Sequence, residues 1–206
     1  MRPPVTTMGS ILFLLFGLSI LSFINGAATS IETPVATPWP EEFTVGFTTK
    51  SGTATGFLAY DWTLKRQAVY HGPGSSYCSA FGTDDVCIMF EIPAGTYLYI
   101  PSSEKCFMTN EGVGSLPPEW TTNSVFVGVE NVPGVGLCKG FAFPPTEHVW
   151  YETVVDSLPC LFVFPDPTMS YYFLPETFVV GAPDEKYFDF PDYCFDEENS
   201  AIKEVV

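Results

Sequence analysis

The stretch Phe43-Thr-Val-Gly-Phe-Thr48 alternates large apolar side chains with small or polar ones, residue by residue. This period of two is typical of a half-buried β-strand, because successive side chains of a strand point to opposite faces. Two more strand-like stretches follow, Gly56-Phe-Leu-Ala-Tyr-Asp-Trp62 and Leu64-Lys-Arg-Gln-Ala-Val-Tyr70, with a predicted turn at residues 61–64 between them. We therefore expect the folded part of the chain to open with antiparallel strands.

The strand pattern continues along the rest of the chain, with turn residues between the strands. In residues 86–92, Ile88 and Phe90 share one face of a predicted strand, whereas Met89 and Glu91 share the other. Further strands are expected at residues 96–100, 106–108, 124–130, 135–143, 148–155, 161–164 and 169–180, the last with a bend at Pro175. Because 19 Pro and 17 Gly interrupt every stretch where a long helix could run, the sequence predicts a mainly β chain with minor α. The expected architecture is a single antiparallel sheet, strongly curved or closed into a half-barrel.

Composition limits the class of protein. The chain has 206 residues, of which 46% are hydrophobic and 16% aromatic, enough for one domain with a core and too apolar for an intrinsically disordered chain. Acidic residues outnumber basic ones by 24 to 8, giving a formal charge of −16. A polyanion of this size repels phosphate backbones, which argues against nucleic acid as a partner. It also avoids anionic membrane surfaces unless cations intervene.

The first 27 residues are predicted to be a secretory signal peptide. Arg2 supplies the positive charge, residues 11–24 form an apolar run, and the small residues at 26–28 suit cleavage. A membrane anchor is the alternative, but 14 residues fall short of the roughly 20 needed to span a bilayer. We expect a secreted protein with no stable membrane insertion after cleavage, and an endomembrane lumen or lysosome as the alternative location.

Six cysteines lie beyond the signal peptide. They are Cys78, Cys87, Cys106, Cys138, Cys160 and Cys194. An even number in an oxidising compartment predicts disulfides, and three are expected, with two plus a spare pair as the alternative. A zinc site is disfavoured because no two cysteines have the close spacing of zinc ligands. Six cysteines allow 15 connectivities. Cys194 follows the last strand on a segment whose acids and Pro191 cannot hold it by burial, so we expect it to be tied to the sheet, preferably to Cys106.

Residues 28–41 are rich in Thr and Pro, and a flexible N-terminal segment is expected there. Residues 42–195 then form the β domain, and residues 196–206 an acidic C-terminal tail. Acidic residues crowd near this end; they are Asp184, Glu185, Asp189, Asp192, Asp196, Glu197 and Glu198. Oxygen ligands at this density could collect calcium outside the cell. The alternative is an acidic surface that is simply solvated, since no calcium-binding loop motif is present.

Catalytic motifs are nearly absent. The chain has two histidines, His71 and His148, and a Ser-His-Asp arrangement could be assembled from one of them with Ser75 or Ser76. No G-x-S-x-G motif accompanies these residues. No catalytic residue is therefore assigned, and a hydrolase is the third of the functions considered.

Aromatic residues carry the remaining signal. Tyr97 and Tyr99 share one face of a predicted strand, and Trp120 and Trp150 lie further along the chain. A curved sheet with aromatic residues on its concave side can enclose an apolar ligand, so these four are the pocket candidates. The alternative is that they fill the core of the sheet.

Several short motifs resemble ependymin-related proteins. They are Gly56–Trp62 with Tyr70-His71-Gly72, Leu116-Pro-Pro-Glu-Trp120, Phe126-Val-Gly128, Leu137-Cys-Lys139, Trp150-Tyr151 with Asp156-Ser-Leu-Pro159, and Gly181-Ala-Pro-Asp184 with Phe188-Asp-Phe-Pro-Asp-Tyr-Cys194. The resemblance covers roughly residues 39–194. It implies a secreted or lysosomal protein whose curved antiparallel sheet folds over helices, as in the lipoprotein carrier LolA. It also implies a hydrophobic cavity, dimerisation and calcium association, and it brings no catalytic residues. The chain departs from the family in having Cys160 where the turn after Pro159 has an apolar residue, and in lacking any N-glycosylation motif.

The sequence thus predicts a secreted, disulfide-stabilised β domain that is not an enzyme and has no cofactor, with calcium as an open alternative. Its expected function is to bind a hydrophobic small molecule or lipid within the curved sheet. The second function considered is an extracellular structural or adhesive protein associated with calcium. A homodimer is expected from the family resemblance.

Overall fold

A computed structural model describes residues 32–50, 52 and 54–195 of the chain. The chain divides into two units, residues 1–32 and 33–206, and the described residues belong almost entirely to the second. The predicted signal peptide and acidic tail, and residues 28–31 of the predicted N-terminal segment, lie outside the described residues. No helix among the residues described is long and apolar enough to cross a membrane.

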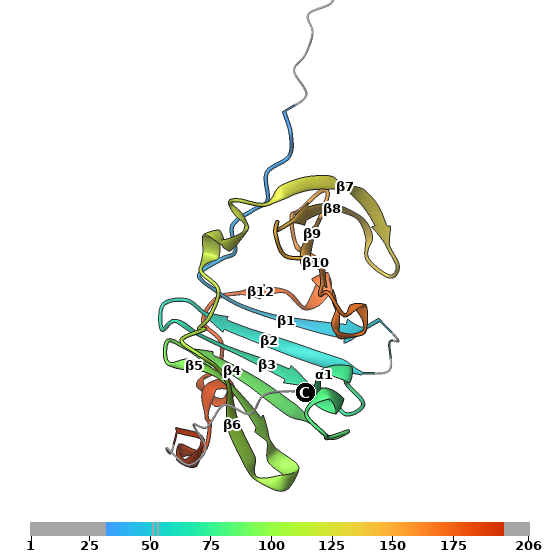
Figure 1. Cartoon of the computed structure of the whole chain (residues 1–206). Helices are drawn as coiled ribbons and strands as arrows, with labels where there is room; N and C mark the ends of the chain where they lie inside the picture. Colours follow the sequence, from blue (N-terminus) through green and yellow to red (C-terminus); the bar gives the residue numbers. More distant parts are fainter. Residues whose placement is uncertain (1–31, 51, 53, 196–206) are drawn as a thin grey trace, which may run out of the picture. The chain divides into compact units, whose positions relative to one another are not determined.

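The folded unit is built on one antiparallel sheet (Figure 1). Its strands are β1 (Glu42–Thr49), β2 (Thr55–Asp61), β3 (Arg66–His71), β4 (Cys87–Ile92), β5 (Gly95–Ile100), β6 (Lys105–Glu111), β7 (Val125–Val132), β8 (Gly136–Ala142), β9 (Val149–Thr153), β10 (Pro159–Val163), β11 (Tyr171–Phe173) and β12 (Val179–Val180). The hydrogen-bonded order is β6-β5-β4-β3-β2-β1-β11-β10-β9-β8-β7, and β12 pairs with β1. The sheet is not closed, because β6 and β7 stand at its two ends. The expected mainly β fold is confirmed, in its open form.

The order of the strands follows from two meanders that meet at β1. Strands β1 to β6 pair in sequence on one side, and β7 to β11 pair in sequence on the other, so that β1 and β11 join the two halves. Phe47 faces Phe173 at this seam, and their rings lie 6.1 Å apart. In Figure 1 the ribbons of β7–β10 accordingly lie on the far side of β1 from β2–β6.

Helical structure is limited to short pieces. The described residues contain one α-helix, α1 (Ser76–Ala80). The 3₁₀ turns are η1 (Pro101–Ser103), η2 (Pro118–Thr121), η3 (Pro167–Met169), η4 (Pro175–Thr177), η5 (Glu185–Phe188) and η6 (Asp192–Phe195). The strand expected at residues 169–180 is therefore wrong in part: η3 and η4 start at prolines and leave only β11 and β12 as strands, because proline removes a backbone donor from the ladder.

The described part of the N-terminal segment is packed onto the sheet, although its sequence predicts flexibility. Ala36 is buried in the main core cluster. The backbone N–H and the hydroxyl of Thr37 donate to the carboxylate of Glu152 at 3.0 and 3.1 Å. Lys139 approaches the same carboxylate at 3.0 Å, and the backbone N–H of Trp39 donates to the carbonyl of Pro118 at 3.0 Å. A buried carboxylate with a cation and two donors holds this segment in place.

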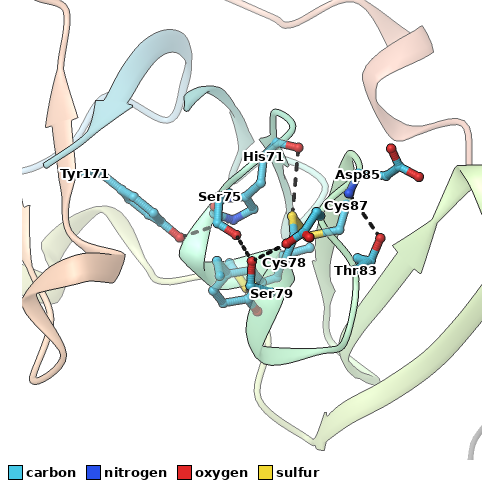
Figure 2. Close-up of a disulfide and its surroundings, with 11 residues drawn as sticks. His71, Ser75, Cys78, Ser79, Thr83, Asp85, Cys87 and Tyr171 are labelled. Atoms are coloured by element: carbon cyan, nitrogen blue, oxygen red, sulfur yellow. Dashed lines mark hydrogen bonds between the residues drawn. A yellow bond between two sulfur atoms is a disulfide. The ribbon is translucent and has the colours of Figure 1, made fainter. Parts of the chain in front are cut away.

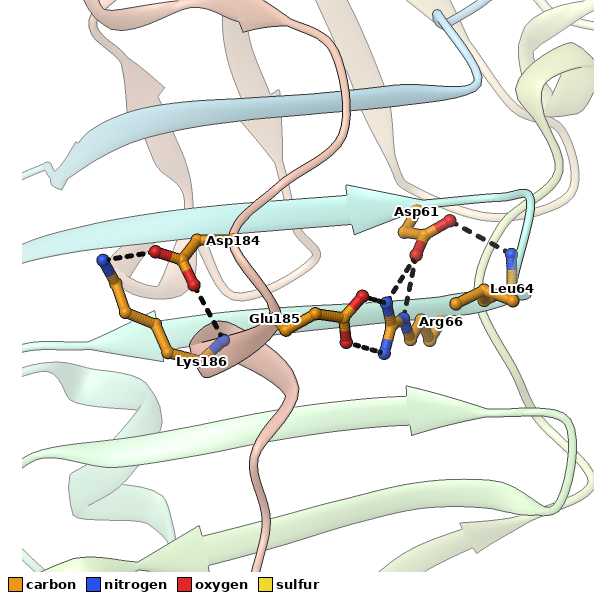
Figure 3. Close-up of polar contacts among 6 residues, drawn as sticks. All are labelled: Asp61, Leu64, Arg66, Asp184, Glu185 and Lys186. Atoms are coloured by element: carbon orange, nitrogen blue, oxygen red, sulfur yellow. Dashed lines mark hydrogen bonds and ion pairs between the residues drawn. The ribbon is translucent and has the colours of Figure 1, made fainter.

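The C-terminal segment covers one face of β2–β6. Phe188 and Phe190 belong to a core cluster with Phe90 and Tyr97, and the rings of Phe90 and Phe190 stack at 4.0 Å. The guanidinium of Arg66 donates to Glu185 at 2.7 and 3.0 Å and to Asp61 at 2.9 Å (Figure 3). These contacts fix the segment at its start, well before the cysteine at its end.

All six cysteines form disulfides, as predicted. The pairs are Cys78–Cys87, Cys106–Cys194 and Cys138–Cys160. The expected pairing of Cys194 with Cys106 is confirmed, and it closes a separation of 88 residues. The other two bridges join α1 to β4 and β8 to β10.

Candidate functional site

The candidate site is an apolar pocket on the face of the sheet opposite the C-terminal segment. Its volume is about 400 Å³, within the range of ligand pockets, about 300–1,000 Å³. One side consists of side chains from β2, β3 and β4, and the other of side chains from β10, β11 and the loop before β9. The lining residues are Trp39, Leu58, Gln67, Val69, Tyr77, Met89, Glu91, Val113, Gly114, Leu116, Trp120, Phe143, Thr146, His148, Phe162, Phe164, Tyr171 and Phe173. The sheet must be curved for strands so far apart in the order to line one pocket.

Alternation along the strands explains why these side chains reach the pocket. On β3, Gln67 and Val69 point to it, while Ala68 between them belongs to the cluster under the C-terminal segment. On β4, Met89 and Glu91 point to it, while Phe90 stacks on Phe190. A strand places successive side chains on opposite faces, so one face is covered by the chain's own end and the other lines the pocket.

Aromatic rings form the wall on the β10–β11 side. The ring centroids of Phe162 and Phe164 lie 4.6 Å apart, and those of Phe164 and Tyr171 lie 5.0 Å apart. Trp120, carried by η2, stacks on Phe143 at 4.6 Å and lies 5.2 Å from Trp39. Rings at these separations pack favourably against one another, which gives the pocket a wall of fixed shape.

The pocket has one polar end, made by Gln67 and Glu91. These residues are direct partners across β3 and β4. Ser115 donates to the side-chain oxygen of Gln67 at 3.2 Å, and the hydroxyl of Thr96 donates to the carbonyl of Val113 at 2.9 Å. The segment after β6 is thereby held beside this end. Burial among apolar side chains raises the pKa of Glu91 to about 8.

Solvent reaches the pocket at its rim. Val113 is 53% exposed, and Thr146, in the loop between β8 and β9, is also exposed. Both belong to the pocket lining. The opening therefore lies between the segment after β6 and the loop before β9, next to the polar end where Gly114 also contributes.

The four aromatic residues predicted for a pocket do not share one surface. Trp120 lines the pocket. Trp150 is 2% exposed and belongs to the main core, 5.4 Å from Trp39 and 5.8 Å from Trp120. Tyr97 and Tyr99 lie on the other face of the sheet, where their rings contact Phe195 and Phe190 at 5.2 and 6.0 Å. The expectation that all four face one concave surface is thus corrected, because the C-terminal segment covers the tyrosine face.

Two of the residues considered for hydrolase chemistry meet in the structure (Figure 2). The hydroxyl oxygen of Ser75 lies 3.4 Å from Nδ1 of His71, and the phenolic oxygen of Tyr171 lies 3.4 Å from Nε2. Both Ser75 and His71 are 1% exposed, and neither lines the pocket. The imidazole stacks on Tyr77 at 4.4 Å, and burial lowers the pKa of His71 to about 3. The cluster holds a neutral imidazole behind Tyr77 of α1 and Tyr171 of β11, both of which line the pocket.

No group of three or more His, Cys, Asp or Glu that could hold a metal ion occurs within residues 32–195 as far as the structure describes them. Two of the acids considered for calcium have cationic partners instead. Asp184 pairs with Lys186 at 2.8 Å, and Glu185 pairs with Arg66 at 2.7 Å (Figure 3). Asp196, Glu197 and Glu198 lie outside the described residues.

Comparison with known proteins identifies no family for this chain. No family model matches the sequence, and no curated protein matches it. Among solved structures, the chain is similar to an uncharacterized conserved protein from Thermus thermophilus, at 10% identity and a TM-score of 0.48. The alignment covers 74% of this chain and 87% of that one.

Proposed function

We propose that this protein binds a hydrophobic small molecule or lipid in the pocket between β2–β4 and β10–β11, without catalysing a reaction on it. The observation that carries the proposal is the pocket itself: about 400 Å³ of space lined almost entirely by aliphatic and aromatic side chains. Apolar space of this size that opens to water favours occupation by an apolar molecule over hydration. The resemblance to ependymin-related proteins supports the same proposal, since that family is expected to have a hydrophobic cavity.

Secretion belongs to the proposal. Three disulfides are consistent with an extracellular or otherwise oxidising compartment. The predicted signal peptide points to the secretory route, with the endomembrane lumen or lysosome as the alternative destination. The homodimer implied by the family resemblance stays a prediction, and light scattering on the purified mature chain would test it.

Native mass spectrometry of the secreted protein tests for a bound ligand directly. After extraction of any lipid, titration with the neutral fluorophore N-phenyl-1-naphthylamine tests whether the empty pocket takes an apolar probe. We expect saturable binding of one probe per chain with a rise in emission.

Cavity-filling variants locate the binding. Val69 is 2% exposed on β3 and lines the pocket, so Val69→Trp should fill part of the space and weaken probe binding about tenfold or more. Met89→Trp, on β4, does the same from an independent position. The matched control is Val127→Trp on β7, where the side chain is 54% exposed and lies outside the pocket lining. Equal binding by wild type and both pocket variants, or no binding by the wild type, would refute the proposal.

A further inference from the structure

One carboxyl group stands out in the pocket lining. Glu91 is the only acidic residue among the described residues that line the pocket, and no Lys or Arg accompanies it there. The surrounding side chains on its own face of the sheet are Gln67, Val69, Met89 and Thr96, the last of which is its direct partner on β5. An acidic group in such a setting needs a partner, because transfer of a carboxylate out of water is costly when nothing compensates its charge.

The two phenols whose pKa values Glu91 affects already have partners within the protein. Tyr77 donates its hydroxyl to the sulfur of Met89 at 3.0 Å. The hydroxyl of Tyr171 lies at His71, and the oxygen of Gln67 accepts from Ser115. Within the described part of the chain, Glu91 has no side-chain hydrogen bond or ion pair. Burial is the main cause that raises the pKa of the Tyr77 and Tyr171 phenols, and the charge of Glu91 raises both further.

We propose, on the basis of the function proposed above, that the pocket selects an amphipathic amine, whose ammonium group pairs with Glu91 while its apolar body lies against the aromatic wall. The missing partner of a carboxylate is a cation with N–H donors, and an ammonium supplies both. Glu91 lies at the polar end beside the opening, so the apolar body would enter the space lined by Leu58, Phe162, Phe164 and Phe173.

Charge argues against the other common classes of lipid. A fatty acid or a phospholipid brings an anion, for which the described pocket lining offers neither Lys nor Arg. Its one imidazole, His148, stacks on the ring of Phe162 at 5.7 Å. The whole chain carries a formal charge of −16, so it repels anionic ligands at long range and attracts cationic ones. Aromatic faces near the ammonium would add attraction, since cations bind to the faces of Trp, Tyr and Phe rings.

Competition among three matched amphiphiles tests this inference. Decylammonium, decanol and decanoate differ only in the head group, and each displaces N-phenyl-1-naphthylamine from the extracted protein at pH 7, below its micelle concentration. The same titrations are run on Glu91→Gln, which keeps the shape of the side chain without its charge. The control is Glu176→Gln, which removes an exposed carboxylate of η4 that lies outside the pocket lining.

We expect decylammonium to displace the probe from the wild type at a concentration about tenfold lower than decanol, with decanoate weakest. Glu91→Gln should abolish the advantage of the amine over the alcohol, and Glu176→Gln should keep it. An amine no better than decanol in the wild type, or an advantage that survives in Glu91→Gln, overturns the inference while probe binding leaves the proposed function standing. If the wild type does not bind the probe, the proposed function itself fails.

Discussion

Glu91 and His71 are two titratable residues whose pKa values are shifted by burial, and both interact with Tyr77 and Tyr171. Glu91 faces the pocket, and its pKa is raised to about 8 by burial. The ring of His71 contacts those of Tyr77 and Tyr171 at 4.4 and 5.6 Å, and its pKa is lowered to about 3 by burial. Each group is held mostly neutral at pH 7 in the empty protein, because the apolar surroundings penalise its charged form. Each therefore couples the stability of the fold to pH, with opposite sign.

For Glu91 the folded pKa lies above the unfolded value, so the folded chain holds a proton that the unfolded chain releases. The free energy of unfolding should therefore fall as pH rises from about 4.5 to about 8. Glu91→Gln removes this loss, and the variant should gain on the order of 3–4 kcal/mol over the wild type between pH 5 and pH 8. Urea unfolding at the two pH values measures the difference. A constant difference between the two proteins would contradict it.

For His71 the folded pKa lies below the unfolded value, so the unfolded chain takes up a proton that the folded chain cannot. Stability should fall as pH drops from about 6.5 toward about 3, by about 1.4 kcal/mol per pH unit from this group. His71→Phe keeps a ring beside Tyr77 and removes the titration. Between pH 6 and pH 4, the unfolding free energy of His71→Phe should change with pH by about 1.4 kcal/mol per pH unit less than that of the wild type. Identical slopes for the two proteins would show that His71 is not the group responsible.

At the scale of elements, β9 is a core strand and η2 is a pocket element, although both carry a tryptophan. Trp150 on β9 is 2% exposed and packs 5.6 Å from Phe173, whereas Trp120 on η2 lines the pocket. The indole N–H of Trp150 is buried and has no hydrogen-bond partner in the described residues. Its contribution to stability therefore comes from packing.

Trp150→Ala should cost about 3–5 kcal/mol of unfolding free energy, as expected for a large core side chain. Trp150→Phe should cost much less, because it keeps a ring in the cluster and removes a buried donor that lacks a partner. Chemical denaturation of the three proteins checks this order. A small loss in Trp150→Ala, accompanied by weaker probe binding, would instead assign Trp150 to the ligand.

The C-terminal segment, η5 and η6 included, is held at both of its ends. Arg66, which also pairs with Asp61, binds Glu185 at its start (Figure 3), and Cys194 closes it onto β6. The two-residue variant Cys106→Ala/Cys194→Ala should lose about 4–5 kcal/mol on the chain-entropy estimate for an 88-residue separation. Cys78→Ala/Cys87→Ala, with a separation of 9, should lose about 2–3 kcal/mol. Equal losses in thermal or urea unfolding would argue against loop length as the origin of the effect.

At the scale of the whole molecule, the pocket depends on the meeting of two meanders. Its walls come from β2–β4 and from β10–β11, about a hundred residues apart, and Trp39 and Trp120 contribute from segments without strands. The seam between β1 and β11 joins the halves. Substitutions at this seam should therefore disturb the pocket as well as the fold.

The mature protein is predicted to lack the first 27 residues, which lie outside the described residues. N-terminal sequencing of material secreted by a eukaryotic host should start near residues 27–29, because the apolar run of residues 11–24 has the length of a signal peptide. Secreted protein that still contains Arg2 would contradict this prediction.

The sequence alone determined most of the strands and the two faces of each, although it missed the turns that interrupt residues 169–180. The alternation in residues 86–92 places Met89 and Glu91 on one face and Ile88 and Phe90 on the other. The structure confirms this placement. The sequence also predicted that Cys194 is tied to the sheet, with Cys106 as the preferred partner, and this pairing is confirmed. The reason given was wrong, because Phe188 and Phe190 of the same segment are buried against the sheet. The strand faces are local features, because a period of two acts over neighbouring residues. The disulfide joins distant residues, but its presence was predictable from the even number of cysteines in a chain expected to be secreted.

Only the tertiary structure decided which face is covered and which is left as a pocket. Tyr97 and Tyr99 were expected at the pocket, and they lie under Phe190 and Phe195 instead. Glu91 was placed on its correct face but was not recognised as a site residue, because its significance depends on Phe162, Phe164 and Phe173 from the other half of the sheet. The alternation of side chains along a strand assigns each residue to one of the two faces of the sheet, but it does not indicate which face will be covered. The two faces become different when segments far apart in the sequence pack onto the sheet. That packing is set by the total apolar area that the fold can bury.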